Sequence, residues 1–443
     1  MSNIPRTALT SLRKWKTHPL RKPLLVRGAR QVGKTYLIKQ FGEEFEYCIE
    51  INFEKDKLVK QFFNDSLEPI HLTQKISAYA NKPIIPGKTL LFFDEIQECE
   101  QAITALRYFK EEMQSLHVIA AGSLIDFKLK HIGMPVGRVQ FLYLYPLSFK
   151  EYCFAVNREK LYQEAQNKLK LNAPLHEILL EEVKRYCWLG GMPAVLDAWI
   201  SQSNYNLCEE VQSEILLSYR QDFNRYAKDH QIPYLERMFS SVGQQLGQKF
   251  KYVTVDPDIR AKDLKEALAL LELAGIIYRA YHTSAQGLPL SSGKEDKRFK
   301  VYLCDTGLLQ RLLNVTMKDW LFQPLTVKHS GNIAEQFVQQ EYIAYTMQQT
   351  PPELFYWHRE EKQSNAEIDF LFLKNRKIIP VEVKSGHSGR MKSLQLFLQS
   401  HPHSPLGLKI SESNEENFNS VEAIPFYAIQ GWLGQNEIWE EKK

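Results

Sequence analysis

The stretch from Gly28 to Thr35, GARQVGKT, constrains the fold of this chain more than any other. It matches the pattern G-x-x-x-x-G-K-[S/T] at every fixed position. The apolar run from Leu24 to Val26 precedes it and indicates a short buried strand, and apolar residues recur at helical spacing after it. A strand, a glycine-bounded loop and a helix form the context in which backbone N–H groups surround a phosphate. The stretch therefore predicts a phosphate-binding loop.

The motif assigns a role to each part of this loop. Lys34 would reach the outer phosphates of a nucleotide, and the Thr35 hydroxyl would bind magnesium. The alternative is a glycine-rich turn that holds a lysine by chance, and the flanking strand and helix argue against it. We expect ATP and Mg²⁺ as cofactors. The expected nucleotide-binding residues are Gly28, Ala29, Arg30, Gln31, Val32, Gly33, Lys34, Thr35 and Tyr36.

Length and composition limit the remaining possibilities. A chain of 443 residues is too long for one core and predicts two or three domains. The net charge of +4 permits a nucleic-acid partner without arguing for one. Six widely spaced cysteines with no C-x-x-C pair indicate a reducing compartment and neither disulfides nor a zinc site. The apolar runs are too short to span a bilayer, so a cytoplasmic protein without a membrane partner is expected.

A second acidic motif supports the nucleotide site. The apolar run from Thr89 to Phe93 ends in Asp94 and Glu95, as expected for a central parallel strand with carboxylates at its ligand-binding end. Asp94 would hold magnesium. Glu95 would polarise the water that attacks the γ-phosphate. An acidic strand end at the surface is the alternative, and the loop upstream makes it the weaker one.

Two further residues have open assignments. The strand from His117 to Ala121 leads to Ser123, which either contacts the γ-phosphate or the attacking water, or caps the next helix. Arg138 precedes a strand predicted from Val139 to Tyr145. It acts either as an arginine finger on a neighbouring chain's nucleotide or as a solvated loop residue.

With these motifs in this order the chain resembles the AAA+ ATPases. More narrowly, it is similar to a prokaryotic AAA+ group that has G-x-R-x-V-G-K-T in the loop and three later motifs. Those motifs match Pro146 to Phe149 (PLSF), Gly190 to Pro193 (GGMP) and Asp305 to Leu308 (DTGL). The resemblance implies a nucleotide-binding core over residues 1–148 and a helical lid over 149–230.

The middle of the chain, residues 231–315, predicts a winged-helix-like region. Leucines from Leu264 to Leu271 form a helical stripe, and Ile276 to Tyr278 begins a strand whose partner is expected from Phe299 to Cys304. The segment from Ser284 to Lys300 is expected to be a mobile wing. Because acidic residues are interspersed with the basic ones, packing is favoured over DNA reading.

A second candidate site lies in residues 325–410. Strands from Glu367 to Leu373 and from Lys377 to Lys384 would pair through a turn centred on Asn375 and Arg376. Asp369 then lies opposite Glu382, and Lys384 shares their face. Pro380 donates no ladder bond, so irregular pairing is expected there.

Neighbouring carboxylates repel unless a cation lies between them, and a divalent metal bound by Asp369, Glu382 and the helical Glu335 would satisfy them. This arrangement resembles the PD-(D/E)XK nucleases, with Glu382 to Lys384 as the E-x-K. The resemblance implies catalytic roles for Glu382 and Lys384, although Ile368 replaces the usual proline before the aspartate. An inactive or merely nucleic-acid-binding domain remains the alternative. Residues 411–443 are expected to form a tail.

The overall expectation is an α/β fold: a P-loop AAA+ parallel sheet with a helical lid, a winged-helix-like middle and a restriction-endonuclease-like C-terminal domain. The function expected is ATP hydrolysis coupled to a nuclease-like domain that binds or cleaves nucleic acid, DNA rather than RNA. The alternative is a nucleotide-switched regulatory ATPase whose nuclease-like domain is inactive. If Arg138 acts on a neighbouring chain, the protein forms a homo-oligomer.

Overall fold

The structure is a computed structural model. It describes residues 4–127, 137–167, 170–322, 327–361, 364–386, 391–414, 416–418 and 420–434.

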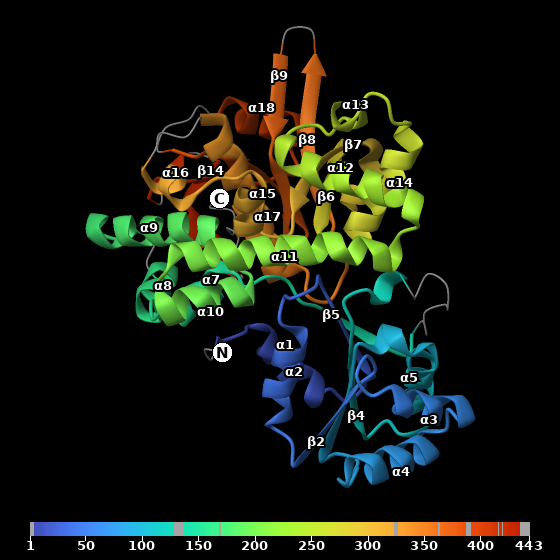
Figure 1. Ribbon diagram of the computed structural model, residues 1–443. Coiled ribbons are helices and arrows are strands. Elements are labelled where there is room, and N and C mark those ends of the chain that lie inside the picture. Colours follow the sequence, from blue (N-terminus) through green and yellow to red (C-terminus); the bar gives the residue numbers. More distant parts are fainter. Residues whose placement is uncertain are drawn as a thin grey trace.

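The N-terminal part is a five-stranded parallel sheet with the strand order β2-β3-β4-β1-β5 (Figure 1). Its strands are β1 (Leu24–Arg27), β2 (Tyr47–Asn52), β3 (Thr89–Asp94), β4 (His117–Ala121) and β5 (Gln140–Tyr143). Its helices are α1 (Ala8–Lys16), α2 (Lys34–Gly42), α3 (Lys60–Asp65), α4 (Pro69–Ala80) and α5 (Glu100–Glu112). Every residue of β3 is buried, which explains its continuous apolar sequence. The strands expected at β1, β3 and β4 are confirmed, and β5 is shorter than its prediction.

The described residues from Phe149 to Tyr226 form helices and no strand. They are α7 (Phe149–Ala155), α8 (Glu159–Asn167), α9 (Ala173–Leu189), α10 (Pro193–Gln202) and α11 (Tyr205–Tyr226). Gly190 to Pro193 separates α9 from α10. The long helix α11 crosses between the N-terminal sheet below and the C-terminal sheets above (Figure 1).

Three helices and two antiparallel strands follow: α12 (Ile232–Gln244), α13 (Tyr252–Val255), α14 (Ala261–Leu273), β6 (Ile277–Thr283) and β7 (Lys294–Leu303). The expected leucine stripe of α14 is buried. The expectation of a mobile wing up to Lys300 is wrong for its second half. β7 begins at Lys294, because its residues pair with β6 and Lys300 lies opposite Ala280 in the buried part of the ladder.

The C-terminal part adds α15 (Thr306–Leu312), α16 (Met317–Phe322), α17 (Val327–Thr346), α18 (Lys392–Ser400) and α19 (Ile429–Gly434). Its strands are β8 (Leu354–Glu361), β9 (Ser364–Ile368), β10 (Phe370–Lys374), β11 (Lys377–Val383), β12 (Gly407–Ser411), β13 (Glu416–Phe418) and β14 (Val421–Pro425). They form two sheets, with the orders β7-β6-β8-β9 and β10-β11-β12-β14-β13. The first sheet joins the middle of the chain to its C-terminal part, because β6 pairs in parallel with β8.

The predicted hairpin is present with the predicted register. Phe370 pairs with Val381, and Asn375 and Arg376 form the turn with positive φ angles. Pro380 pairs with Leu371 in the same unbroken register, so the expected irregularity is not found.

Two other expectations for this part are corrected. The continuous strand from Glu367 to Leu373 is split at Asp369, whose carboxylate accepts the Val383 N–H at 2.7 Å; β9 joins one sheet and β10 the other. The expected tail is also partly structured, because β13, β14 and α19 lie beyond residue 411 and β14 pairs with β12. Residues 435–443 lie outside the described residues.

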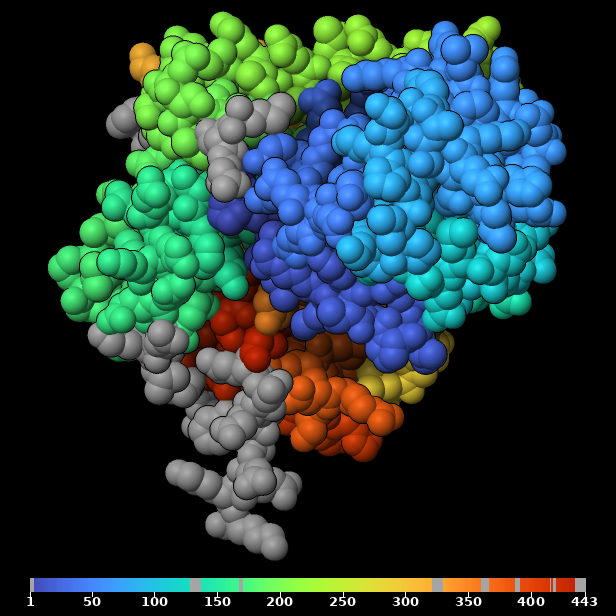
Figure 2. All heavy atoms as spheres, turned by 90° about the horizontal axis from the view of Figure 1, so that it is seen from below, coloured from blue at the N-terminus to red at the C-terminus, as the bar shows by residue number. Residues whose placement is uncertain are grey.

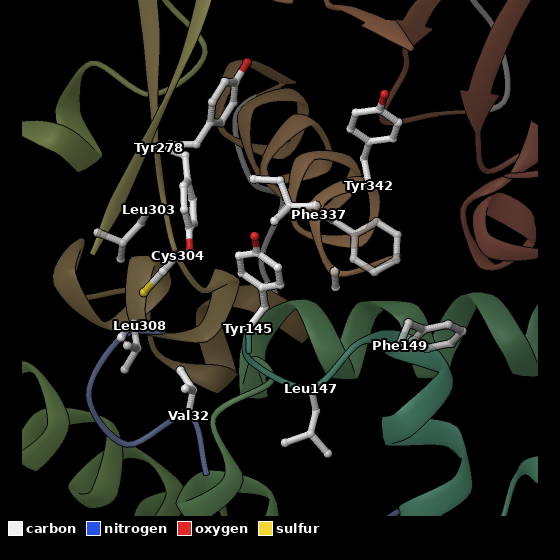
Figure 3. Packing of buried hydrophobic residues seen from close by; sticks show 14 of the residues in the cluster. Val32, Tyr145, Leu147, Phe149, Tyr278, Leu303, Cys304, Leu308, Phe337 and Tyr342 are labelled. Atoms are coloured by element: carbon white, nitrogen blue, oxygen red, sulfur yellow. The ribbon is translucent and has the colours of Figure 1, made fainter. Parts of the chain in front are cut away.

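The buried hydrophobic residues that the structure describes form three clusters, one of which extends through all these parts. Val32 of the phosphate loop, Tyr145 and Leu147 after β5, and Leu308 of α15 belong to the same buried cluster (Figure 3). Seen from below, residues of the N-terminal part border residues of the helical part, and C-terminal residues are visible beside both (Figure 2). Among the described residues no helix is long and apolar enough to cross a membrane.

Candidate nucleotide site and acidic cluster

The phosphate loop is shaped by two glycines that no other residue could replace without strain. Gly28 has φ +146°, and a Cβ atom there would lie 2.1 Å from the carbonyl oxygen of Leu144. Gly33 has φ +92° and precedes the first residue of α2. The loop therefore turns tightly between β1 and α2 and leads directly into the helix N-terminus, where an anion is favoured.

Lys34 lies inside this loop. Its Nζ donates to the carbonyl oxygens of Gly28 and Ala29 at 2.9 and 2.8 Å. Burial lowers the pKa of Lys34 to about 8, although Glu95 and Asp94 act in the opposite direction. A phosphate beside the ammonium would favour the charged form and reverse this shift.

The residues predicted to bind magnesium are in contact. The Thr35 hydroxyl donates to both oxygens of Asp94 at 3.2 and 3.1 Å, and the Asn52 side-chain amide donates to Asp94 Oδ2 at 3.1 Å. Burial raises the pKa of Asp94, and the neighbouring Glu95 adds to that effect. A hydroxyl beside a carboxylate is the oxygen donor set that Mg²⁺ prefers, so these residues fit the ion.

Glu95 immediately follows β3 in a left-handed conformation with φ +49°, which is uncommon for a residue other than glycine. The Gln97 side-chain amide donates to Glu95 Oε2 at 2.6 Å and fixes the carboxylate. Ser123, at the end of β4, lines the same cavity as Glu95 and the phosphate loop.

The loop, Glu95 and Ser123 line a cavity of about 590 Å³. Its remaining wall contains apolar groups from three parts of the chain, Ile4, Leu147 and Pro193. A cavity of this size lined by both charged and apolar groups suits a nucleotide, because phosphates and a base require different surroundings.

α11 holds the loop from outside. Both Asp222 carboxylate oxygens accept from the Arg30 guanidinium at 2.7 and 2.9 Å, and the Tyr219 hydroxyl donates to the Arg30 carbonyl at 3.1 Å. Gln31 also bonds to Ser218 of the same helix at 2.9 Å. The long helix therefore contacts the loop at consecutive residues.

The three motifs after the nucleotide core meet behind the loop. The Gly191 N–H donates to Asp305 Oδ2 at 2.6 Å, and the Leu147 N–H donates to the Gly191 carbonyl at 2.7 Å. Asp305 also caps α15, and Ser148 caps α7 with a capping box. Burial raises the pKa of Asp305 to about 6. PLSF, GGMP and DTGL thus form one hydrogen-bonded junction.

Arg138 lies far from this site. Arg138 precedes β5, and Gln140, the first residue of β5, pairs with Leu24, the first residue of β1. The phosphate loop, in contrast, follows the last residue of β1. The Arg138 guanidinium pairs with Glu111 at the end of α5 at 2.8 Å. In its own chain Arg138 therefore lies at the sheet edge opposite the loop.

The C-terminal acidic residues also converge. The Glu382 carboxylate accepts from the Lys384 ammonium at 2.6 Å and is buried, with its Oε2 atom unpartnered. Burial raises the pKa of Glu382, and Lys384 opposes that effect. Asp369, which lies where β9 meets β10, extends the hairpin register by one residue and so faces Glu382.

Glu335 of α17 also belongs to this group. It is joined to the other carboxylates by Lys300, a residue for which the sequence indicated no role. The Lys300 ammonium lies 3.2 Å from Glu335 Oε2, 2.5 Å from Glu367 Oε1 and 3.9 Å from Asp369 Oδ1. The Tyr302 hydroxyl donates to Glu335 Oε2 at 3.0 Å. We call Glu335, Glu367, Asp369 and Glu382 the acidic cluster.

The acidic cluster does not fit a divalent cation in this arrangement. Lys300 contacts three of its carboxylates and Lys384 contacts the fourth. In the part of the chain that the structure describes, no three acidic, histidine or cysteine side chains are grouped closely enough to hold a metal.

Comparison with known families identifies the N-terminal part. Residues 20–153 match the model of an AAA domain, and this range contains the phosphate loop, Asp94, Glu95 and Ser123. This part is an AAA-type P-loop domain. Residues 180–319 match a domain of unknown function (DUF8612), and residues 330–429 match another (DUF4143). The sequence matches no curated protein.

Solved structures with a similar chain path include a Walker-type ATPase of Pyrococcus abyssi, with 16% identity and a TM-score of 0.45. That similarity covers 70% of this chain and 96% of the other. The ORC1 protein of Aeropyrum pernix, solved in complex with DNA, is similar at 12% identity, a TM-score of 0.30, and coverage of 70% and 93%. Both scores lie below 0.5, so neither similarity supports an inference about this chain.

Several site residues have no strong sequence signal. Asn52 is the last residue of β2 and lies beside Asp94. A role for Asn52 at the site is indicated in the sequence by its position at the carboxyl end of a parallel strand alone. Asp222 lies 192 residues from its partner Arg30 in the sequence. Lys300 lies 35 residues from its partner Glu335. Nothing local in the sequence indicates these contacts.

Proposed function

We propose that this protein binds and hydrolyses ATP in the cavity between the phosphate loop and α10. The observation that carries the proposal is the single cavity lined by Lys34, Thr35, Glu95 and Ser123, with Asp94 hydrogen-bonded to Thr35. These residue types, at these positions in an AAA-type domain, are the parts that phosphoryl transfer needs.

Each residue has a defined role in the proposed reaction. Lys34 and the loop N–H groups hold the phosphates, and Glu95 accepts a proton from the attacking water while Gln97 fixes its orientation. Thr35 and Asp94 would hold Mg²⁺, which neutralises charge on the phosphates. Ser123 would contact the γ-phosphate or the water. Ile4, Leu147 and Pro193 would surround the base.

Loss of ATP binding on substitution of Lys34 tests this proposal. We expect Lys34→Ala to abolish saturable binding of a fluorescent ATP analogue at concentrations that saturate the wild type. Lys88→Ala is the control, because Lys88 pairs with Glu46 at 2.9 Å on the exposed surface and does not line this cavity. Equal binding by wild type and Lys34→Ala would contradict the assignment.

A second candidate function rests on the convergence of Glu335, Asp369, Glu382 and Lys384. The pattern of these four residues supports a nuclease-like C-terminal unit that binds nucleic acid, and the expected ligand is DNA rather than RNA. The unit would cleave the nucleic acid if a metal gained access to the carboxylates. The winged-helix-like arrangement of α12 to β7 would then pack against this unit. In the alternative, the unit is inactive and the ATPase switches the shape or assembly of the protein.

Binding and cleavage separate these possibilities. Fluorescence anisotropy with single- and double-stranded DNA and RNA measures binding, which should weaken steeply with salt if phosphates are contacted. Incubation of the same substrates with Mg²⁺ or Mn²⁺ measures cleavage, with Glu382→Ala as the control. Absence of both binding and cleavage would favour the nucleotide-switched alternative.

A further inference from the structure

Lys300 occupies an unusual place for a lysine. Its side chain is 2% exposed, and its ammonium lies among carboxylates from three different segments: Glu335 on α17, Glu367 on β9 and Asp369 between β9 and β10. Lys300 itself belongs to β7, which follows the nucleotide core by about 150 residues. Its backbone is fixed in the β6–β7 ladder opposite Ala280.

The Lys300 ammonium and the carboxylates around it stabilise each other. A buried ammonium is costly unless carboxylates compensate it, and neighbouring buried carboxylates repel unless a cation lies between them. Burial alone would lower the pKa of Lys300, but Glu335, Tyr302, Asp369 and Glu367 together raise it well above its ordinary value. The contacts of its ammonium with the Glu335 and Glu367 carboxylates favour the charged form of Lys300.

The position of this charge matters for metal binding. Glu335 and Asp369 are two of the three residues whose types and positions suggest a divalent-metal site, and the Lys300 ammonium contacts both. The third, Glu382, is paired with Lys384. A divalent ion bound by Glu335 and Asp369 would lie close to the Lys300 ammonium, where like charges repel strongly in a buried, low-dielectric setting.

We propose that Lys300 is the built-in cation of the acidic cluster, and that a divalent metal binds these carboxylates only when the Lys300 ammonium is removed or withdrawn. The proposal rests on the contacts of the cluster and does not require that the protein bind nucleic acid or hydrolyse ATP. It assigns Lys300 a role as a positioning residue that holds Glu335, Glu367 and Asp369 together.

Metal binding to the nucleotide-free full-length protein tests the proposal. The fraction of free Mn²⁺ is measured by electron paramagnetic resonance during titration of wild type, Lys300→Met, and Lys300→Met combined with Asp369→Asn. We expect Lys300→Met to bind one Mn²⁺ at least about ten times more tightly than wild type, and the added Asp369→Asn to abolish this gain. An Lys300→Met protein that is folded and gains no site overturns the proposal.

A matched control separates this effect from the loss of any buried lysine. Lys374 is also buried, but its ammonium donates to the Trp432 carbonyl, away from the cluster. Lys374→Met should gain no Mn²⁺ site. A gain equal to that of Lys300→Met would overturn the proposal, because metal uptake would then not depend on the cation of the cluster.

The wild type provides a test that does not depend on how Lys300→Met folds. Wild type and Asp369→Asn should show the same Mn²⁺ titration curve, because Lys300 already fills the cluster in the wild type. A wild-type Mn²⁺ site that Asp369→Asn removes would overturn the proposal directly. Mn²⁺ should also raise the melting temperature of Lys300→Met more than that of the wild type; equal shifts in both would contradict the proposal.

Discussion

The Arg30 guanidinium, at the centre of the phosphate loop, donates to both carboxylate oxygens of Asp222 on α11, at 2.7 and 2.9 Å. This contact joins the nucleotide core to a helix that also contacts the middle of the chain, since α11 packs on α12 and α15. The conformation of the loop is therefore coupled to helices outside the AAA-type domain.

Asp222→Asn should weaken ATP binding about ten-fold. The substitution removes the charge that orients Arg30, so part of the binding free energy of ATP must be used to order the loop. A hydrogen bond to a charged group contributes about 1.5–3 kcal/mol, which is enough for a ten-fold change in affinity. The measurement is the Kd for ATP by calorimetry. Glu236→Gln is the control, because Glu236 pairs with Arg220 of α11 away from the loop; an equal loss of affinity in both variants would contradict this prediction.

Gly275→Ala should lower both ATP affinity and melting temperature. Gly275, which follows α14, has φ +71°, and a Cβ atom there would lie 3.3 Å from the backbone nitrogen of Ala29. The substitution would both strain Gly275 and press on the phosphate loop, at a cost of about 1–3 kcal/mol.

The control for Gly275 is Gly87→Ala. Gly87 has a similar φ of +83° but no atom within 4 Å of an added Cβ, so it reports backbone strain alone. Both variants should melt at lower temperature, and Gly275→Ala alone should lose ATP affinity. Unchanged ATP affinity in Gly275→Ala would show that the contact with Ala29 does not shape the loop.

Glu341→Gln should change how stability depends on pH. Glu341, on α17, accepts the Phe149 N–H at 2.7 Å and the Gln430 amide at 2.9 Å. Burial raises its pKa from 4.5 to about 8, although these two bonds oppose the shift. A carboxyl whose pKa is raised on folding favours the folded state below pH 4.5, and this contribution is lost as pH rises towards 8.

The measurement is the free energy of unfolding by urea between pH 5 and pH 8. The wild type should lose stability relative to Glu341→Gln as pH rises, by up to about 1.4 kcal/mol per pH unit, because one more proton is bound in the folded state than in the unfolded state. Parallel curves for the two proteins would refute the assignment.

Arg138→Ala should slow ATP turnover at least about ten-fold without weakening ATP binding, if Arg138 completes the site of a neighbouring chain as an arginine finger. Turnover per chain in the wild type should then rise with protein concentration. Glu111→Gln is the control, because it releases Arg138 from its present partner while keeping the guanidinium. A wild type that stays monomeric and hydrolyses ATP at full rate would exclude this role.

The sequence predicted features that depend on local patterns. The phosphate loop, the acidic end of β3, and the hairpin that places Asp369 opposite Glu382 follow from motif spacing and turn geometry, and the structure contains all three. The break at Asp369 was not predictable, because it depends on a hydrogen bond to Val383 in another strand. The contacts of Lys300 in the acidic cluster were not predictable either, because its partners lie in later segments of the chain.

The parallel pairing of β6 with β8 is the clearest case of a feature beyond local reasoning. These strands are about 70 residues apart, and neither sequence specifies a partner. Their pairing places Lys300 beside α17 and β9 and so determines the composition of the acidic cluster.

We propose that Glu95 activates water for ATP hydrolysis at the phosphate loop. Single-turnover hydrolysis of radiolabelled ATP by wild type and Glu95→Gln, with the ATP Kd measured in parallel, tests it most directly. We predict an unchanged Kd and a hydrolysis rate at least about 100-fold lower in Glu95→Gln, since a positioned general base contributes about 10²–10⁴ in rate. Equal hydrolysis rates in the two proteins would contradict the account.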